Sequence, residues 1–303
     1  MDHLLLRSLA RHDGLASRRQ LLQDGVSQRM LDLAWRSGRL VRVRHGVYAT
    51  PGLARPLVRA ARVGGALAGP SATTLLGGWC PPGDVLFVSA RRNDHRLRDP
   101  DDAGRLLDQH SPHVSVIRDL HRLDAATERL CASPVTAASQ CVRHLPEWEA
   151  IAVLDSLRRA GHLLDPVDVE LVRRALPSRL RPVIDLVDAR AGSGTESIMR
   201  VRLRAAGIAT LVQPQVTADI RPDLLIGDRL IVECVSVEHH SSPEEYNKDR
   251  RRIARLVVLG YTVLEFPYPE ICFNWPAVLE TVESAMWTLG IAKGEQPRIR
   301  TLR

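Results

Sequence analysis

Two carboxylates stand at matching ends of two short apolar runs in the last third of the sequence. Asp223 opens the run 224–226, and Glu233 closes the run 230–232. A Gly-Asp pair separates the two runs, so the pattern predicts a β-hairpin. Such a hairpin brings both carboxylates to one edge of a sheet, where two hard oxygen ligands on rigid strands suit Mg²⁺ or Mn²⁺. The sequence therefore predicts a divalent-metal site around Asp223 and Glu233.

This arrangement resembles the PD-(D/E)xK nucleases, whose motif Pro222-Asp223 and Glu233 match. More closely, the last third of the chain is similar to nuclease-like domains related to very-short-patch-repair endonucleases, which occur at the C-terminus of actinobacterial proteins. Further motifs of that family follow in its order: Ser193-Gly194-Thr195-Glu196-Ser197, the hairpin, His240, Asp249-Arg250-Arg251-Arg252, and the run 260–266. The resemblance implies a restriction-endonuclease-like core with the order α-β-β-β-α-β.

The chemistry implied by the resemblance is hydrolysis of DNA phosphodiester bonds. A divalent ion on Asp223 and Glu233 would lower the pKa of a bound water, and Glu196 would hold a second ion or orient that water. Lys248 or His240 would act as general base or donate to the transition state. Three consecutive arginines would contact the DNA backbone: Arg250, Arg251 and Arg252.

One departure bears on the activity. The family usually has Glu-x-Asp-Gly where this chain has Glu233-Cys234-Val235-Ser236, and the nuclease motif has Lys where Val235 stands. Valine can neither bind a metal nor polarise a water. A non-catalytic reading therefore stays open, in which Glu196 only caps its helix and residues 250–252 form a solvated face.

The first segment is basic. Residues 1–55 contain ten arginines and four aspartates, a net charge of +6 in a chain whose total is +7. Helix signals predict three short helices, the third over 28–36 with Met30, Leu33 and Ala34 at core spacing, followed by two strands around a basic turn. This order indicates a winged helix-turn-helix, and uneven charge of this kind favours nucleic acid as the partner. The side chains expected at DNA are Gln28, Arg29 and Arg36 on the third helix, and Arg39, Arg42 and Arg44 on the wing.

The same segment resembles the N-terminal domain of AbiE-type (type IV) antitoxins. Its runs 14–21 and 42–48 recur there in this order, and the Pro-Val-Thr motif at 134–136 matches the segment that follows. The resemblance implies sequence-specific binding to double-stranded DNA, often at the protein's own promoter, and a cognate toxin. The alternative is a winged helix that packs against the rest of the chain or a partner.

The composition is that of an ordinary globular protein, with 45% hydrophobic and 25% charged residues among 303. Five scattered cysteines fit cytosolic thiols, and the absence of a leader or a long apolar run suggests a cytoplasmic protein outside membranes. We expect an α/β multidomain chain: a winged helix over 1–54, an α/β antitoxin-like middle domain over 55–190, and a nuclease-like domain over 191–303. Within these, the sequence predicts helices over 60–68 and 180–189 and an inner strand over 261–266.

Two functions remain. The first is a DNA-binding, metal-dependent endonuclease, in phage defence, restriction or repair, where a homodimer would place one site on each strand. The second is a non-catalytic regulator or antitoxin of a type IV toxin-antitoxin system that carries a degenerate nuclease fold.

Overall fold

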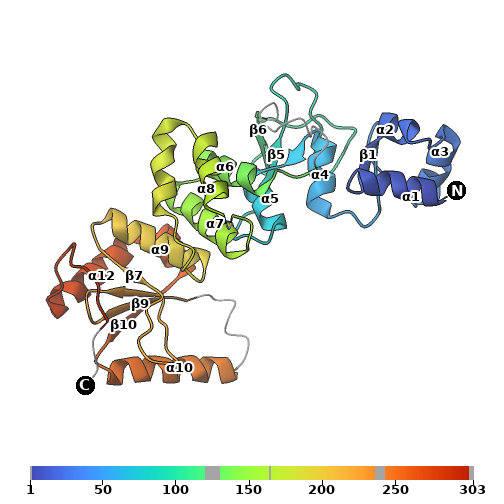
Figure 1. Cartoon of the computed structure of the whole chain (residues 1–303). Helices are drawn as coiled ribbons and strands as arrows, with labels where there is room; N and C mark the ends of the chain where they lie inside the picture. Colours follow the sequence, from blue (N-terminus) through green and yellow to red (C-terminus); the bar gives the residue numbers. More distant parts are fainter. Residues whose placement is uncertain (1, 120–129, 164, 236–242, 300–303) are drawn as a thin grey trace. The chain divides into compact units, whose positions relative to one another are not determined.

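The structure is a computed structural model that describes residues 2–119, 130–163, 165–235 and 243–299 (Figure 1). It divides into two compact units. The first contains Met1–Gly77 and Pro81–Cys141, and the second contains Gly78–Cys80 and Val142–Arg303. This division does not decide the boundaries expected after residues 54 and 190, which stay predictions. None of the helices in the described part combines the length and apolar character needed to cross a membrane.

The first unit begins with three helices and a small antiparallel sheet. The elements are α1 (Asp2–Arg11), β1 (Leu15–Ser17), α2 (Arg18–Gln23), α3 (Gln28–Arg36), β2 (Val41–Arg44) and β3 (Val47–Ala49), and the strand order is β1-β3-β2. Ser17 and Gln20 form a capping box at α2, and the Ser27 hydroxyl accepts from the Met30 amide at the start of α3. These caps fix the helix starts where the sequence predicts them.

One core residue of α3 differs from the prediction. Leu31 and Ala34 are buried, whereas Leu33 is 47% exposed. Since Leu31 and Ala34 are three residues apart, they share a face with each other and leave Leu33 on the outer side.

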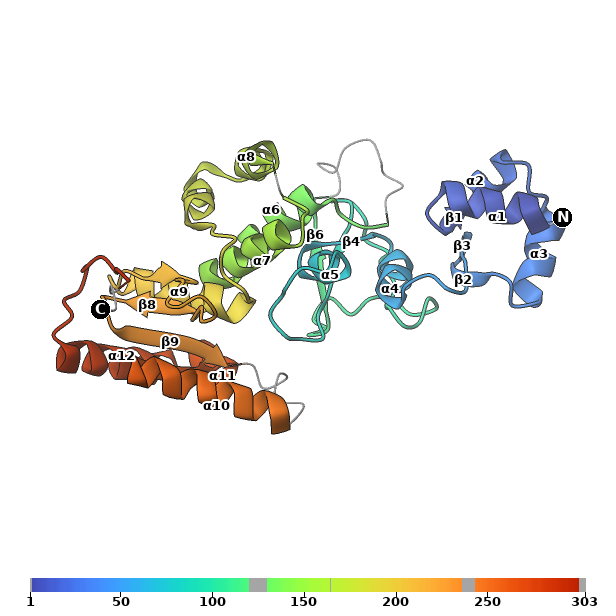
Figure 2. The same ribbon diagram turned by 60° about the horizontal axis from the view of Figure 1, so that its bottom comes forward.

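The rest of the first unit is a second three-stranded sheet with helices beside it (Figures 1 and 2). It comprises α4 (Arg55–Val63), β4 (Ala66–Leu67), α5 (Gly69–Leu75), β5 (Leu86–Ser89), β6 (Val114–Ile117) and the helix α6 (Pro134–His144), with strand order β4-β5-β6. The helix predicted over 60–68 is wrong in its second half. Gly64 has φ 120°, which ends α4, and a Cβ at Gly65 would lie 1.9 Å from the Ser89 carbonyl oxygen. The chain therefore turns here and pairs β4 with β5.

The second unit is a four-stranded sheet with helices on both faces. Its elements are α7 (Glu147–Arg159), α8 (Pro166–Ala175), the 3₁₀ helix η2 (Ser178–Leu186), α9 (Gly194–Ala205), β7 (Leu211–Val212), β8 (Leu224–Ile226), β9 (Leu230–Val235), α10 (Pro243–Val258), β10 (Thr262–Pro267), α11 (Tyr268–Phe273) and α12 (Trp275–Leu289). The strand order is β10-β9-β8-β7, with β10 parallel to β9 and the other pairs antiparallel. Strand β10 is thus an edge strand and not the inner strand predicted, because β9 is its one partner among the described strands.

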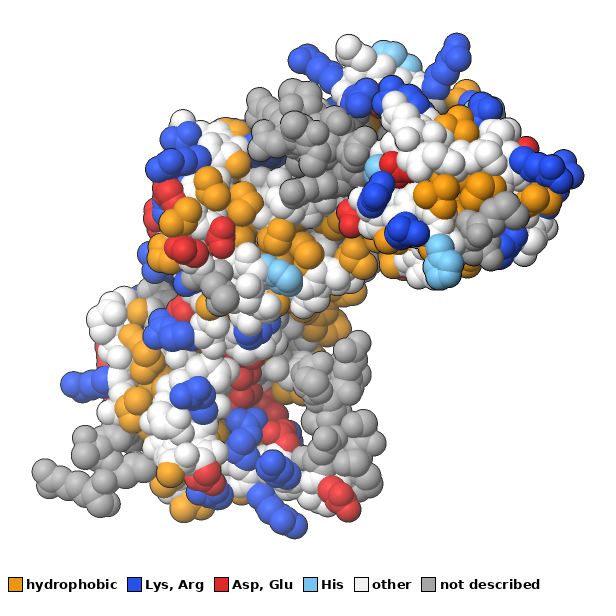
Figure 3. All heavy atoms as spheres, turned by 45° about the vertical axis from the view of Figure 1, so that its right-hand side comes forward, with side chains coloured by type: hydrophobic (Ala, Val, Ile, Leu, Met, Phe, Trp, Pro, Cys, Tyr) orange, Lys and Arg blue, Asp and Glu red, His pale blue; other side chains and the backbone are white. Residues whose placement is uncertain are grey.

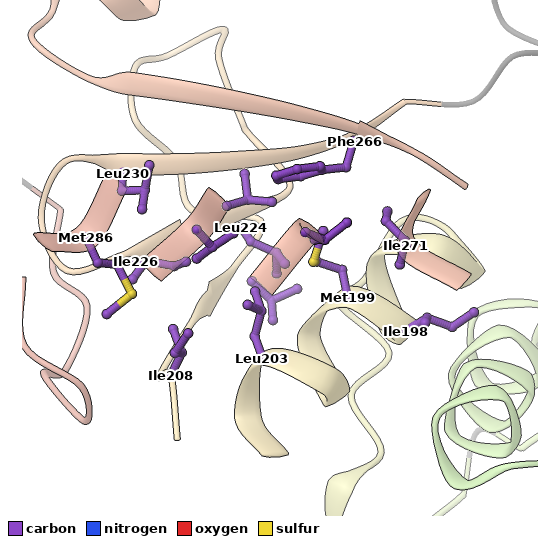
Figure 4. Packing of buried hydrophobic residues seen from close by; sticks show 14 of the residues in the cluster. Ile198, Met199, Leu203, Ile208, Leu224, Ile226, Leu230, Phe266, Ile271 and Met286 are labelled. Carbon is purple, nitrogen blue, oxygen red and sulfur yellow. The ribbon is translucent and has the colours of Figure 1, made fainter. Parts of the chain in front are cut away.

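Alternate residues of the hairpin serve the two faces of this sheet. Leu224 and Ile226 pack with α9 and α12 (Figure 4), while Leu225 and Ile231 pack with Leu256 of α10. The sheet is therefore buried on both sides, which is why its strands read as continuous apolar runs.

Trp79 joins this unit from a distant part of the sequence. Its backbone amide donates to the Ser156 hydroxyl at 2.9 Å, and its ring covers Gly194 so closely that a Cβ there would lie 2.1 Å from Cδ2. The first turn of α9 is packed on this ring.

Candidate functional site

The hairpin of β8 and β9 brings the two predicted carboxylates to the same edge. Leu224 pairs with Val232, so Asp223 and Glu233 are the next residues outward on the two strands. Asp223 Oδ2 accepts a hydrogen bond from the Cys234 amide at 2.8 Å. Glu233 is only 4% exposed. The edge therefore holds two carboxylates in a largely dry setting.

Glu196 reaches this edge from α9 through a residue that sequence reasoning missed, Gln213. The Gln213 Nε2 atom donates to Glu196 Oε2 at 2.8 Å and to Asp223 Oδ1 at 3.3 Å, and the Gly192 amide also donates to Glu196 Oε2. Gln213 has φ 48°, a left-handed backbone that is uncommon outside glycine and often marks a functional position. The signal in the sequence is weak: a polar residue directly after the short strand β7.

Arg252 of α10 is the cation beside these carboxylates. Its Nη1 atom lies 2.6 Å from Glu233 Oε1, and its Nη2 atom lies 2.8 Å from Asp249 Oδ1. The second pair joins Asp249 to an arginine one turn later on the same helix. Arg252 thus pairs directly with Glu233, and its positive charge also acts on Asp223.

The crowding of carboxylates changes their titration. Burial raises the pKa of Asp223 to about 8, and the nearby charges of Glu196 and Glu233 add to the shift. Burial also raises the pKa of Glu233, against the opposing effect of Arg252. A cation at this edge would relieve the repulsion that a third negative charge creates.

The donor set fits a hydrated divalent ion held by two carboxylates. Mg²⁺ commonly takes one or two carboxylates and keeps several waters, and Asp223 and Glu233 would supply them. Within the described ranges, no group of three or more His, Cys, Asp or Glu side chains is placed to hold a metal ion. Glu196 accordingly acts on Asp223 through the Gln213 amide.

Of the two residues predicted to supply a base, the structure describes Lys248. Lys248 is exposed on α10 and lines a cavity of about 420 Å³ together with Asp219 and Arg255, whose side chains form an ion pair at 2.5 Å. His240 and His239 lie outside the described residues. Val235 ends β9 and is the hydrophobic residue where the nuclease motif has Lys.

The basic run of α10 is mostly engaged within the protein. Arg250 pairs with Glu265 at 2.8 Å, as Arg252 does with Glu233, while Arg251 is exposed. Figure 3 shows acidic and basic side chains next to each other on this unit. Val257 is 57% exposed, and the adjacent Leu256 is buried. Of the predicted DNA contacts on this helix, Arg251 alone is open without breaking a described ion pair.

Most of the predicted contacts of the first segment are exposed to solvent. Arg29 and Arg36 of α3 are exposed, as are Arg39 and Arg42. Gln28 is exposed too, with its side chain held between Arg18 and Asp32 by hydrogen bonds of 2.7 and 2.9 Å. The Arg42 guanidinium lies 5.2 Å from the centre of the Trp35 ring, a cation–π contact.

Arg44 differs from this group. It is half-buried and faces a cavity shared with segment 91–97. The outer face of α3 with its flanking arginines therefore forms a cationic surface without Arg44.

Residues 3–51 match the family model described as "Transcriptional regulator, AbiEi antitoxin". The match ends just after β3, so it covers the three helices and the first sheet.

Two curated relatives extend the likeness along the chain. Each is described as an uncharacterized protein of Mycobacterium tuberculosis, one from strain CDC 1551 / Oshkosh and one from strain H37Rv. Both are 28% identical to this chain over 258 residues, a stretch that covers 79% of this chain and 89% of the relative. The shared stretch is therefore much longer than the AbiEi segment alone.

Proposed function

We propose that this protein is a DNA-binding transcriptional regulator of the AbiEi antitoxin kind, whose residues 1–54 form a winged helix-turn-helix. The observation that carries the proposal is the coincidence of the family match with the cationic surface. The matched residues 3–51 fold as one core and turn Gln28, Arg29 and Arg36 of α3 outward. A helix presenting such side chains suits the major groove, with Arg39 and Arg42 at phosphates.

The test of this function is DNA binding by the full chain to the region upstream of its own gene. Arg29→Gln and Arg36→Gln should each weaken binding, and whichever of the two contacts a phosphate should also reduce the slope of log K against log salt by about 1. Arg179→Gln is the matched control, since Arg179 is an exposed arginine of the second unit. Binding that is absent in the parent protein, or equal in all four proteins, would remove the proposal.

Two further properties follow from the antitoxin kinship as proposals. The protein would have a cognate toxin as partner, acting in the cytoplasm, and would bind double-stranded DNA as a homodimer. Co-expression with the neighbouring gene product, and the mass of the DNA-bound species by light scattering, address these two points separately.

A second candidate function is the metal-dependent endonuclease, with a restriction-endonuclease-like core in residues 191–303. The element order α9-β7-β8-β9-α10-β10 supports it, as does the meeting of three carboxylates at one sheet edge. A bound Mg²⁺ would activate water and neutralise charge on the scissile phosphate. Asp223 and Glu233 would hold the ion, Glu196 and Gln213 would orient Asp223, and Lys248 or His240 would have to supply the proton acceptor that Val235 cannot.

Two features of the site favour the regulator over the enzyme. Arg252 already neutralises Glu233, so a metal must displace this arginine or share the carboxylate with it. Both oxygens of Asp223 accept hydrogen bonds, from Gln213 and from the Cys234 amide. The edge is thus largely satisfied from within the protein.

Calorimetry with Mg²⁺ and Mn²⁺, joined to nicking of supercoiled plasmid, separates the two functions. An endonuclease requires both signals in the parent protein and their loss in Asp223→Asn and Glu233→Gln. DNA binding without metal binding or nicking would leave the regulator alone.

A further inference from the structure

A cavity of about 530 Å³ opens within the first unit. Strand β2 and helix α2 of the antitoxin-like segment line it on one side, and α4 and segment 91–97 line it on the other. Four of its lining residues are arginines and one is an acid: Arg19, Arg44, Arg91, Arg96 and Asp94. The cavity wall therefore carries an excess of positive charge.

None of the four guanidinium groups forms an ion pair with a carboxylate in the part of the chain that the structure describes, although the charge of Asp94 acts on Arg44. No hydrogen bond or ion pair joins the guanidinium of Arg19, Arg44, Arg91 or Arg96 to another described residue. Nearby arginines of the same unit behave differently: Arg59 pairs with Asp101 at 2.9 Å, and Arg62 donates to the carbonyls of Val43 and Pro100. The open arginines thus gather where the cavity lies.

Arg44 is the arginine of this cavity that is most shielded from solvent. It is half-buried, and its Nε atom is shielded from solvent and has no hydrogen-bond partner among the described residues. Burial lowers the pKa of the Arg44 guanidinium from its ordinary value, and the charge of Asp94 offsets only part of this effect. An arginine stays charged under these conditions, so a buried and unsatisfied donor of this kind costs free energy until an anion meets it.

The backbone makes room for this arginine. Gly64 has φ 120°, and a Cβ there would lie 2.9 Å from Arg44 Nη1. A larger residue at this position would press against the guanidinium. The glycine therefore allows Arg44 to lie along the cavity wall.

We propose that this cavity binds a phosphoryl group, held by Arg44 together with Arg91 and Arg96. Guanidinium forks match phosphate oxygens in pairs, and such charge-assisted bonds are among the stronger hydrogen bonds in proteins. A multiply charged anion suits four arginines and one aspartate better than a carboxylate does. The volume is that of a site for a small phosphorylated molecule, and DNA is the other source of the same chemistry.

A ligand in this cavity would touch both Arg19 and Arg44 of the antitoxin-like segment and the 91–97 segment. Its binding would hold these parts of the first unit against each other. Phosphate occupancy would then raise the thermal stability of the first unit, by the ordinary linkage between binding and folding.

Calorimetric titration of the full chain with pyrophosphate, in the absence of DNA, is the first experiment. Arg44→Gln and Arg91→Gln should each weaken pyrophosphate binding about tenfold or more, since each removes charge-assisted hydrogen bonds. Arg92→Gln is the matched control, because Arg92 is the exposed neighbour of Arg91 and does not line the cavity. Arg44→Gln removes an unpaired buried charge, so its unliganded form should be at least as stable as the parent.

A DNA titration of the same variants identifies the source of the phosphoryl group. Pyrophosphate binding that weakens in the two cavity variants alone supports a small ligand. No pyrophosphate binding, with DNA affinity lost in the two cavity variants and kept in Arg92→Gln, supports DNA phosphates in the cavity. The proposal is overturned if all variants bind pyrophosphate equally. It is also overturned if the two cavity variants bind both pyrophosphate and DNA as the parent protein does. Because the first titration contains no DNA, it succeeds or fails independently of the proposed regulator function.

Discussion

The outer face of α3 and the edge of the β8–β9 hairpin both concentrate charge, but they treat it in opposite ways. On α3, Arg29 and Arg36 stand exposed, so their charge is available to a partner. At the hairpin edge, Glu233 is tied to Arg252, and Asp223 accepts from Gln213 and the Cys234 amide. The residue types of a motif therefore do not show whether its charged side chains are already paired within the protein. A charged side chain without such a partner can bind a ligand directly, whereas a paired one must first break a contact.

The largest expected effect on stability concerns a buried carboxylate whose oxygens accept several hydrogen bonds. Asp155 is fully buried in the second unit and accepts from Arg200, Ser197 and the Asp188 amide at 2.9, 2.7 and 2.7 Å. Asp155→Ala should lower the free energy of unfolding by about 3–5 kcal/mol, because it leaves Arg200 buried without its counter-charge. Urea denaturation measures this loss. Asp185→Ala, which removes an exposed partner of Arg173, should change it little, and an equal loss in both variants would contradict the account.

The next effect depends on pH. Asp223 has its pKa raised from 3.8 to about 8, so the folded protein keeps a proton that the unfolded chain releases. This contribution to stability is present in full below the unfolded value and falls as pH rises towards 8, by up to about 1.4 kcal/mol per pH unit. Denaturation of the parent protein beside Asp223→Asn between pH 5 and pH 8, values chosen to span this window, should show the parent losing stability relative to the variant. Parallel curves would show that Asp223 is ionised throughout.

A smaller effect tests whether Arg252 competes with a metal ion for Glu233. Arg252→Gln frees Glu233, so it should tighten Mn²⁺ binding at the hairpin edge about tenfold, the usual size of one charge-assisted contact. Calorimetry measures the change, and Arg251→Gln on the same helix is the control. Equal affinities in the two variants would mean that Arg252 and the metal do not compete.

The smallest effect is an expected near-absence of change. Because Arg29 and Arg36 are exposed and make no described ion pair, their replacement by Gln should alter the free energy of unfolding by less than about 0.5 kcal/mol. Thermal denaturation of the DNA-binding variants checks this. A larger loss would mean that these charges stabilise the fold, and the contrast with the hairpin edge would fail.

Most of the correct predictions depend on signals between residues that are close in the sequence. Ser17, Ser27 and the Gly-Asp turn specify helix starts and a hairpin through contacts a few residues apart, and α3 has the predicted bounds. The features that the sequence did not predict depend on contacts between distant segments. The Arg252–Glu233 pair, the Gln213 bridge and the edge position of β10 depend on how distant segments meet, which no local spacing encodes.

The same limit applies to the middle of the chain. Residues 64–68 continue the small-residue run of a predicted helix, yet Gly65 must approach the Ser89 carbonyl of a strand more than twenty residues later. Apolar periodicity also misjudged Leu33, which is 47% exposed while the adjacent Ala34 is buried. Which of two adjacent aliphatic residues is buried was decided by packing and not by hydrophobicity.

Trp79 has a consequence for how the protein is made. During synthesis, Trp79 leaves the ribosomal exit tunnel long before Gly194 and the first turn of α9. The Trp79 ring packs on that turn in the folded protein. At ordinary rates of about 5–20 residues per second, the indole waits on the order of ten seconds without its partner. The second unit therefore cannot mature from the C-terminal half alone, and a gene fragment that begins after Cys80 would yield a polypeptide lacking part of its own interior.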